Sequence, residues 1–247
     1  MKKIISIVIA TYNAEKTIKR CLDSIVSQKN DQIELVIVDG ASTDGTIDII
    51  RCYGEGIDIF ISERDEGVYD AWNKALKLVT GKYIQFLGAD DFYLDGQLMK
   101  YMNYVLLLSH DVDIVSAQSH YVDVTEKLLM IRGEIYSWEK MKKNMCLSHG
   151  SILHNVNLFK QNGVFDASYK ICADYELLVR KGELSNIAFY PSPVIQMKGG
   201  GLSFSYLCHW ETFVIRKSHR TVGRLYNYYL LFRGCIGFTL KKIIWNV

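Results

Sequence analysis

The chain has little proline and lacks the short motifs that identify the commonest nucleotide-binding and metal-binding proteins. Only two prolines occur in 247 residues, Pro191 and Pro193, so no proline-rich linker divides the chain. The six cysteines include no Cys-x-x-Cys pair, which argues against a zinc knuckle or a redox motif. The segment after the first apolar run, 11–14, lacks the glycines of a Gly-x-Gly-x-x-Gly loop, and no P-loop sequence occurs. A Rossmann-type dehydrogenase is therefore disfavoured.

Long apolar runs and a strong net charge are also missing. No stretch reaches the roughly 18 apolar residues of a membrane-spanning helix, and the run Ile4–Ala10 is too short for a signal peptide. The net charge is only +2, so we expect no nucleic-acid partner. The charge is unevenly distributed, because Leu207–Val247 holds seven Lys and Arg residues and a single acid, Glu211. We therefore expect a mildly acidic body, 1–206, followed by a basic aromatic tail, 207–247.

Strand-like and helix-like patterns alternate through the first half of the chain. Short apolar runs typical of buried strands lie at Ile4–Ala10, Leu35–Val38, Ile57–Ile61 and Tyr83–Leu87. Apolar residues at helical spacing follow Asn13, which is a good N-cap residue, then follow Gly45, and then cover 67–79. This order predicts an α/β fold with a doubly wound, mostly parallel sheet.

The second half is less regular. We expect strands at Asp113–Ala117, His120–Leu129 and Ile187–Met197, and helices at Ser137–Asn144 and Asp174–Lys181. A nucleotide-binding half would then cover 1–95, and an acceptor-binding half would cover 96–206.

Polar side chains follow each of the four expected strands of the first half. They are Thr11 and Asn13, then Asp39, then Glu63 and Asp65, then Asp90 and Asp91. In parallel sheets of this kind, ligands bind outside the carboxyl ends of the strands. The pattern therefore predicts one site at this edge of the sheet.

Adjacent Asp90 and Asp91 favour a divalent cation. Two neighbouring carboxylates after a buried strand repel each other unless a cation relieves them, and Mg²⁺ or Mn²⁺ prefers carboxylate and phosphate oxygens. The alternative is a solvated turn in which Asp91 caps the next helix. Asp39 has a similar pair of interpretations: it accepts hydrogen bonds from a base or ribose, or it forms an Asx turn.

Asp174 begins the last expected helix of the acceptor half. A carboxylate there suits a general base that removes the proton of a sugar hydroxyl, and its alternative role is N-capping. Glu176 competes for the role of base. His149 has no second histidine at ligand spacing, so a core or surface histidine is its alternative.

Five segments in this order resemble the family 2 glycosyltransferases, which have the GT-A fold, and especially the branch that builds bacterial O-antigens, capsules and exopolysaccharides. The segments are Ser6-Ile-Val-Ile-Ala-Thr-Tyr-Asn13, Leu35-Val-Ile-Val-Asp39-Gly-Ala-Ser-Thr-Asp44, the block 62–91 ending in Gly-Ala-Asp90-Asp91, Phe165–Arg180 with Ser148-His149-Gly150 before it, and Gly199-Gly-Gly-Leu-Ser203. The likeness spans about 4 to 205. Gly40 departs from it where a second aspartate is common, and Ala89 departs where the first acid of an Asp-x-Asp motif is expected.

The resemblance implies an inverting enzyme that uses a nucleotide-diphosphate sugar, with UDP favoured, and Mn²⁺ or Mg²⁺. It assigns Asp91 to the metal, Asp174 to catalysis, and His149, Glu176 and Ser203 to the acceptor side. The residues implied to bind the donor are Thr11, Tyr12, Asn13, Asp39, Asp65, Asn73, Lys74 and Asp90. A sugar-nucleotide-binding module without activity and a nucleotidyltransferase are the alternatives.

The tail suggests where the acceptor is found. Apolar residues recur near helical period on one face, at Leu225, Tyr229, Phe232, Ile236, Leu240 and Ile243. A basic, aromatic helix of this kind suits the surface of an anionic membrane. We therefore expect a cytoplasmic protein in peripheral contact with the inner membrane, acting on a lipid-linked glycan. The alternative is that this helix packs on the catalytic domain or on a second subunit.

Overall fold

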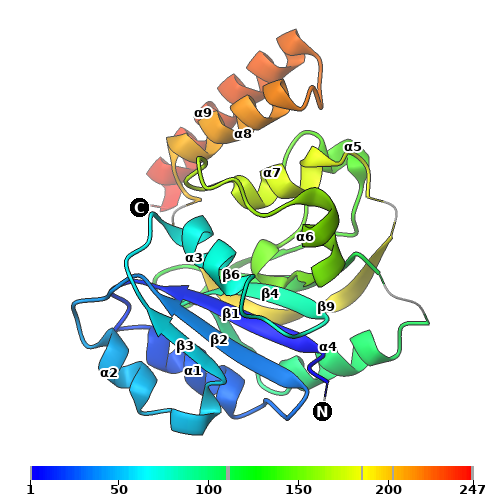
Figure 1. Ribbon diagram of the computed structural model, residues 1–247. Helices are drawn as coiled ribbons and strands as arrows, with labels where there is room; N and C mark the ends of the chain where they lie inside the picture. The colour runs from blue at the N-terminus through cyan, green and yellow to red at the C-terminus, as the bar shows by residue number, and fades with distance from the viewer. Residues whose placement is uncertain (1, 110–111, 185, 202, 246–247) are drawn as a thin grey trace.

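The computed structural model describes residues 2–109, 112–184, 186–201 and 203–245, and of the side chains in 241–245 only that of Lys242. Within these ranges nine strands form one sheet in the order β3-β2-β1-β4-β8-β6-β9-β5, with β7 paired to β6 (Figure 1). The strands are β1 (Ile5–Thr11), β2 (Ile33–Asp39), β3 (Ile59–Ser62), β4 (Tyr83–Gly88), β5 (Phe92–Tyr93), β6 (Ile114–Val122), β7 (Leu128–Arg132), β8 (Leu153–Asn155) and β9 (Ile187–Lys198).

The sheet is mostly parallel. Strands β1 to β4 are parallel to one another, and β6 is parallel to β9. The short β8 runs antiparallel between β4 and β6, and β5 and β7 are antiparallel at the margins. The expected doubly wound α/β architecture is confirmed.

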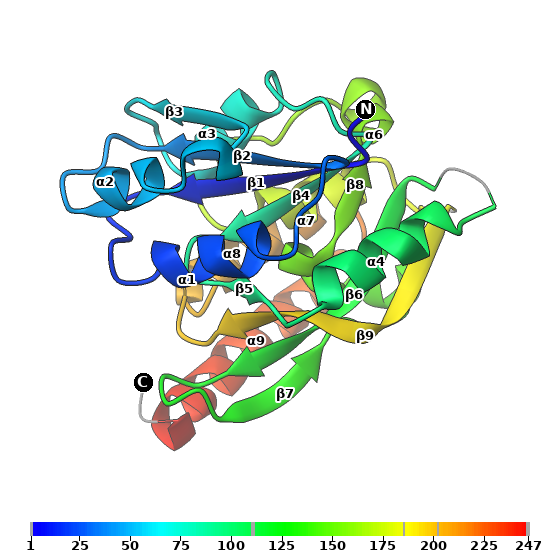
Figure 2. The ribbon, with the colours of Figure 1, turned by 90° about the horizontal axis from the view of Figure 1, so that it is seen from below.

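Helices cover both faces because the central strands are apolar on both faces. Ile7 of β1 packs into one core cluster and its neighbour Val8 packs into the other. The first cluster lies under α1 (Ile18–Val26), α2 (Thr46–Arg51) and α4 (Gln97–Leu106). The second lies under α3 (Val68–Ala75), α5 (Trp138–Met141), α6 (Val156–Asn162) and α7 (Ala173–Arg180), as Figures 1 and 2 show from two sides. Single turns η1 (Gly54–Gly56) and η2 (His149–Ser151) complete the body.

The predicted break at 118–119 between two strands is wrong. Strand β6 runs unbroken across it, and the chain turns at 123–127 instead, where Asp123 accepts hydrogen bonds from the amides of Thr125 and Lys127. Polar residues inside β6 suggested a break. However, they have partners in the core, such as the 2.6 Å hydrogen bond between Ser119 Oγ and Ser148 Oγ.

The predicted cap at Asn13 is also wrong. Helix α1 begins at Ile18, and Asn13 has a left-handed backbone with φ of 49°. Its side chain instead accepts a hydrogen bond from the amide of Thr43, at 2.9 Å. Helix α3 ends at Ala75, four residues before the expected end, and the sequence pattern did not reveal α4, α6, β5 or β8.

The tail forms two helices, α8 (Tyr206–Ser218) and α9 (Arg224–Trp245), which lie side by side and extend beyond the body (Figure 1). Asn227 links them, because it accepts from Arg216 Nε at 2.6 Å and donates to the carbonyl of Phe213. No helix in the described part of the chain is long and apolar enough to cross a bilayer.

Candidate active site

The strand ends meet at one edge of the sheet, as the sequence predicted. Thr11 lies opposite Asp39, and Asp39 lies opposite Ser62. On the other side of β1, Ala10 lies opposite Gly88, two residues before Asp90. The polar residues of four separate segments therefore share this edge.

Asp39 is fully buried, and both its oxygens have partners. Oδ2 accepts from the amide of Ser42 at 2.9 Å and from Ser62 Oγ at 2.7 Å, while Oδ1 accepts from Ser42 Oγ. The expected alternative, an Asx turn, does not form as such, because the amide that Asp39 binds is three residues on, although the side chain does hold the turn that follows β2. Its contact with a base or ribose stays a prediction.

The position of Asp65 explains why residue 40 is a glycine. A Cβ at position 40 would lie 2.6 Å from Asp65 Oδ2, which is closer than real side chains approach. Asp65 Oδ1 in turn accepts from the amide of Gly67. The glycine therefore makes room for a carboxylate from the next strand exit.

The first strand exit leaves two groups available. The Thr11 hydroxyl is buried without a hydrogen-bond partner among the described residues, and Tyr12 is 62% exposed. Asn13 is bound to the segment that follows β2, because its backbone amide donates to Ser42 Oγ at 2.8 Å. A hydroxyl without a partner and an exposed ring suit contacts with a ligand.

Asn73 and Lys74, on α3, both bind other parts of the chain. Asn73 Nδ2 donates to the carbonyl of Phe165, and its Oδ1 accepts from the amide of the same residue. Lys74 Nζ donates to the carbonyl of Arg64 and pairs with Glu63 and Asp70. Asn73 therefore anchors the segment that leads to Asp174, and the predicted contact of Asn73 and Lys74 with the donor stays a prediction.

Asp90 and Asp91 differ in exposure. Asp90 is exposed, whereas Asp91 is 7% exposed, and burial followed by the charge of Asp90 raises the pKa of Asp91 well above its usual range. A Cβ on Gly88 would lie 2.9 Å from Asp90 Oδ1 and 3.0 Å from Asp91 Oδ2, so the glycine admits both carboxylates. Asp91 does not cap the next helix, because α4 begins at Gln97.

This pair fits a divalent cation. The oxygens are hard ligands, and the buried Asp91 accepts backbone hydrogen bonds from Lys198 and Gly88 but has no cation paired with it among the described residues. No group of three or more metal-ligating side chains occurs in the described part of the chain. The remaining ligands would therefore be phosphate oxygens and water, as is usual for Mg²⁺ bound with a nucleotide.

Asp174 is the second residue of α7, so it is not the N-cap. Its Oδ1 accepts from Tyr69 Oη at 3.2 Å, and its Oδ2 lies 3.9 Å from His149 Nδ1. Burial raises its pKa to about 6. A carboxylate with this pKa is largely ionised at neutral pH and still basic enough to take a proton.

His149 packs into an aromatic cluster beside Asp174. Its ring stacks on Trp72 with centroids 5.2 Å apart, and burial lowers its pKa to about 3, so it is neutral. Its Nε2 has no hydrogen-bond partner among the described residues. His149 therefore packs in the core, as its alternative interpretation predicted, and also lies beside the candidate base Asp174.

Glu176 faces away from Asp174. Two residues apart on a helix is about 200°, so the side chains point to opposite sides. Glu176 is buried, receives hydrogen bonds from the Arg180 guanidinium, and lies 2.8 Å from His219 Nε2. It therefore belongs to a closed ionic cluster, although the sequence presented it as a competitor of Asp174 for the role of base.

Glu211 is a positioning residue that the sequence interpretation missed. From α8, its carboxylate accepts hydrogen bonds from the amides of Lys170, Ile171 and Cys172, at 2.7, 2.9 and 2.9 Å. This fixes the backbone immediately before Asp174. The signal in the sequence was that Glu211 is the one acid of a basic tail.

Ser203 is exposed, in the loop 199–205, which includes Leu202 outside the described residues. It lines a cavity between the body and the two tail helices. Its predicted place on the acceptor side stays a prediction.

Comparison with known proteins gives a consistent result. The model for "Glycosyl transferase family 2" matches residues 6–164. A "PGL/p-HBAD biosynthesis glycosyltransferase" of Mycobacterium bovis is 33% identical over 181 residues, covering 71% of this chain and 68% of that protein. The Escherichia coli "UDP-Glc:alpha-D-GlcNAc-diphosphoundecaprenol beta-1,3-glucosyltransferase WfaP" is 30% identical, covering 68% of this chain and 64% of its own length.

Solved structures agree on the fold. The mannosyltransferase PcManGT from Pyrobaculum calidifontis, solved with GDP-Man and Mn²⁺, superposes with a TM-score of 0.66 at 20% identity, covering 91% of this chain and 66% of that one. The chain thus spans about two thirds of the length of each of these three relatives.

Proposed function

The chain belongs to glycosyl transferase family 2 and has the GT-A fold, and from that premise we propose that it is an inverting, cation-dependent enzyme using a UDP-sugar. The acceptor in this proposal is a hydroxyl of a lipid-linked glycan at the cytoplasmic face of a membrane, in the synthesis of a surface polysaccharide such as an O-antigen. The name of the E. coli relative supports both substrates, since it specifies UDP-Glc and a diphosphoundecaprenol-linked sugar for that protein. Family membership favours an enzyme over a binding module.

One observation carries the proposal: the segment His149-Gly150 touches both key carboxylates. A Cβ on Gly150 would lie 3.7 Å from Asp91 Oδ2, and His149 Nδ1 lies 3.9 Å from Asp174 Oδ2. Asp91 and Asp174 are therefore separated by one short turn, η2. This spacing suits a sugar held between a diphosphate on one side and an acceptor hydroxyl on the other.

The chemistry assigned to the residues follows from this placement. The Asp174 carboxylate takes the proton of the acceptor hydroxyl as that oxygen bonds to the anomeric carbon. The bond from that carbon to the diphosphate breaks, UDP leaves from the opposite face, and the configuration inverts. Asp91, supported by Asp90, would hold a cation whose chemistry is to neutralise charge on the departing diphosphate. Thr11, Tyr12, Asn13, Asp39, Asp65, Asn73 and Lys74 stay candidates for holding the donor.

The outer face of α9 supports a membrane location. Leu225, Tyr229, Phe232, Ile236 and Leu240 form a stripe at helical spacing, each between 54% and 86% exposed. Ile243, the sixth expected member, lies outside the described side chains. The opposite side of α9 packs on α8, where Asn227 and Phe238 are buried. The helix therefore packs on protein with one side and leaves an apolar face for anionic lipid with the other.

Two measurements test the proposal. The protein should transfer glucose from UDP-glucose to a GlcNAc-diphospholipid in the presence of Mn²⁺, lose this activity on chelation, and give a product whose new linkage is inverted by NMR. A retained configuration would contradict the assigned chemistry.

For the membrane part of the proposal, the full chain should sediment with anionic vesicles at low salt, whereas a chain truncated before Leu225 should stay folded and no longer sediment with them. A full-length protein that ignores such vesicles would contradict that part.

A further inference from the structure

A cavity of about 430 Å³ lies between the body and the tail helices, outside the edge that holds Asp91 and Asp174. Five separate segments build it: the end of β7, the segment after α5, the loop after β9, and the facing sides of α8 and α9. Its lining residues on the first three are Arg132, Asn144, Ser203 and Phe204, and those on the helices include His209, Thr212, Arg216, Arg233, Gly234 and Gly237. Figure 2 shows that β7 and α9, which both contribute to this lining, lie near each other.

The lining is cationic. It contains three arginines and no acid, and none of the three forms an ion pair among the residues that the structure describes. Arg132 is held with its guanidinium 3.6 Å from the centroid of the Tyr121 ring. A pocket with several guanidiniums and no counter-ion favours an anion with several oxygens.

Arg216 shows that this charge is built into the fold. It is 2% exposed, and burial lowers its pKa. Its Nε donates to Asn227 Oδ1 at 2.6 Å and its Nη1 donates to the carbonyl of Lys143 at 2.6 Å. These contacts come from neutral groups, so the buried positive charge is oriented but not neutralised. Burying an uncompensated charge is costly, which a bound anion would offset.

Two glycines of α9 shape the cavity. A Cβ on Gly234 would lie 2.8 Å from His209 Nδ1, so the glycine lets α9 approach α8 closely. A Cβ on Gly237 would meet nothing within 4 Å, so this position faces open space. The two glycines therefore bring α9 close to α8 and leave open space in the cavity next to Arg233.

The cavity is connected to the site through α8. Thr212, which lines the cavity, lies 3.7 Å from Cys172 Sγ, and Cys172 precedes Asp174 by two residues. The adjacent Glu211 holds the backbone of 170–172. On its other side, α9 carries the exposed apolar stripe that begins at Leu225. The cavity thus lies between the proposed base and the proposed lipid-facing surface.

We propose that this cavity binds the diphosphate that joins the acceptor glycan to its lipid. The proposal rests on the proposed function, because it requires a lipid-linked acceptor. Arg132, Arg216 and Arg233 provide the hydrogen-bond donors for the phosphate oxygens, the glycan extends toward Asp174, and the lipid leaves along the apolar face of α9. Donor binding at Asp90 and Asp91 does not involve these arginines.

The test uses Arg132→Gln and Arg233→Gln, singly and together, because neither side chain is fully buried and the fold should survive. Lys242→Gln is the matched control, since it removes one charge from an exposed position of α9 outside the cavity. Each protein is assayed with a GlcNAc-diphospholipid and with the same sugar on a neutral alkyl chain, together with metal-dependent hydrolysis of the UDP-sugar.

We expect each arginine variant to raise KM for the diphosphate acceptor by about tenfold, as loss of a charged hydrogen bond implies, with kcat unchanged. The neutral acceptor and donor hydrolysis should be unaffected, and Lys242→Gln should match the wild type. Inorganic diphosphate with chelator present should bind the wild type by calorimetry and bind the double variant more weakly.

Three results would overturn the proposal. Equal KM increases on both acceptors would mean that the arginines support the fold or the glycan. An equal effect of Lys242→Gln, accompanied by equal loss of binding to phosphatidylglycerol vesicles, would mean general attraction to a membrane surface. No binding of inorganic diphosphate by the wild type would remove the site itself. A failed proposed function is distinct from all three, because the wild type would then transfer sugar to neither acceptor.

Discussion

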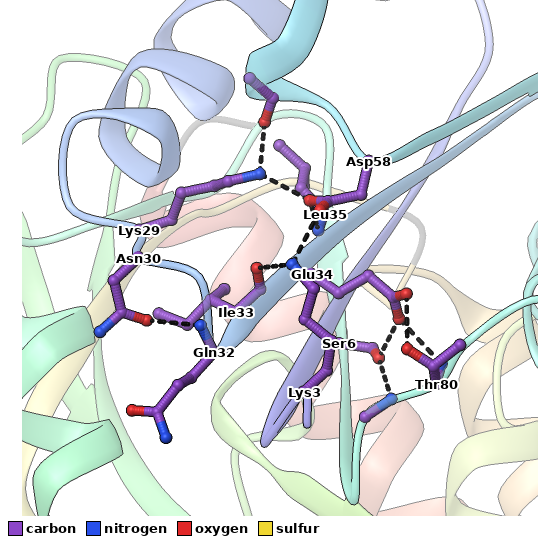
Figure 3. A network of polar contacts seen from close by, with 12 residues as sticks. Lys3, Ser6, Lys29, Asn30, Gln32, Ile33, Glu34, Leu35, Asp58 and Thr80 are labelled. Atoms are coloured by element: carbon purple, nitrogen blue, oxygen red, sulfur yellow. Dashed lines mark hydrogen bonds and ion pairs between the residues drawn. The ribbon is translucent and has the colours of Figure 1, made fainter. Parts of the chain in front are cut away.

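At the amino end of the strands, the buried carboxylate of Glu34 meets hydroxyls and an amide, whereas at the carboxyl end the buried carboxylate of Asp91 meets another carboxylate. Glu34 accepts from Ser6 Oγ at 2.5 Å and from both the amide and the hydroxyl of Thr80, at 2.9 and 2.8 Å (Figure 3). Asp91, which is similarly buried, has Asp90 beside it.

A second pair of carboxylates repeats the contrast. Asp58, near the amino end, is bound by Lys3 and Lys29 and by the amide of Leu35. Burial acts to raise its pKa, but the hydrogen bonds from Lys29 and Lys3 lower it overall. Asp174, by contrast, has one hydroxyl at 3.2 Å and a neutral histidine at 3.9 Å, and its pKa is raised.

The difference separates structural carboxylates from chemical ones. At the amino end the donors are supplied by the chain itself, so the charges stabilise the fold. At the carboxyl end Asp39 is satisfied in the same way, but Asp91 and Asp174 have like charge or few donors beside them, and they are available to a cation or a proton. Burial alone does not distinguish structural from chemical carboxylates, but the partners of each carboxylate do.

The largest expected effect is at Asp91. Asp91→Asn should lower transfer by roughly 10³-fold or more, since a catalytic cation contributes several kcal/mol to the transition state. The fold should be retained, because no described cation is paired with Asp91. Steady-state assays with and without chelator check this. Full activity of the variant in chelator would show that the carboxyl end needs no cation.

The second prediction concerns pH. Because Asp174 must be ionised to accept a proton, and its pKa is about 6, the rate should fall about tenfold per pH unit below that value. The rate should level off above about pH 7. A transfer rate under chemistry-limited conditions, measured from pH 5 to 8, checks this. A flat profile across this range would place the base elsewhere.

The third prediction compares how one buried carboxylate from each end of the strands affects the free energy of unfolding. Glu34→Gln should lower the free energy of unfolding by about 1–3 kcal/mol, because it disturbs a satisfied buried network. Asp174→Asn should raise it at pH 8, by ~3 kcal/mol at most. A raised carboxyl pKa contributes stability below its ordinary value near 3.8, and this is lost as pH rises through 6.

Urea unfolding at pH 8 measures both variants without added metal or donor. The gain from Asp174→Asn should disappear at pH 4, where the wild-type carboxyl is mostly protonated. Changes of the same sign in both variants at pH 8 would remove the distinction between the two ends.

The smallest effect is expected at an exposed pair. Arg20 and Glu126 form an ion pair whose side chains are both about half exposed. Glu126→Gln should change the free energy of unfolding by less than ~1 kcal/mol, because solvent screens such pairs. The same urea experiment checks this prediction. A loss of unfolding free energy comparable to that of Glu34→Gln would show that exposure does not determine how much a carboxylate contributes to stability.

The sequence predicted the carboxyl edge well because its signals are local. Each apolar run ends at a polar residue, as at Asp39 and Asp91, and strand exits of a parallel sheet meet by geometry alone. The unbroken β6 was not predictable, because the polar Ser119 is satisfied by Ser148, which is 29 residues away.

The partners of Asp174 were not predictable for the same reason. Glu211 reaches the amides of 170–172 across about 40 residues, and nothing in local spacing indicates this contact. Likewise, the cavity combines Arg132, Arg216 and Arg233 from three elements. The sequence favoured Asp174 as the base and left Glu176 as a competitor, and the partners of each carboxylate distinguish the two.

The most direct test of the account compares those two carboxylates by one measurement, the kcat for sugar transfer. Asp174→Asn should lower kcat by roughly 10²–10⁴-fold while binding of the UDP-sugar, measured by calorimetry, is unchanged. Glu176→Gln, which disturbs the cluster with Arg180 and His219, should lose stability but keep its kcat while folded. An active Asp174→Asn beside a folded but inactive Glu176→Gln would contradict the central claim that the partly unsatisfied carboxylate at this edge is the base.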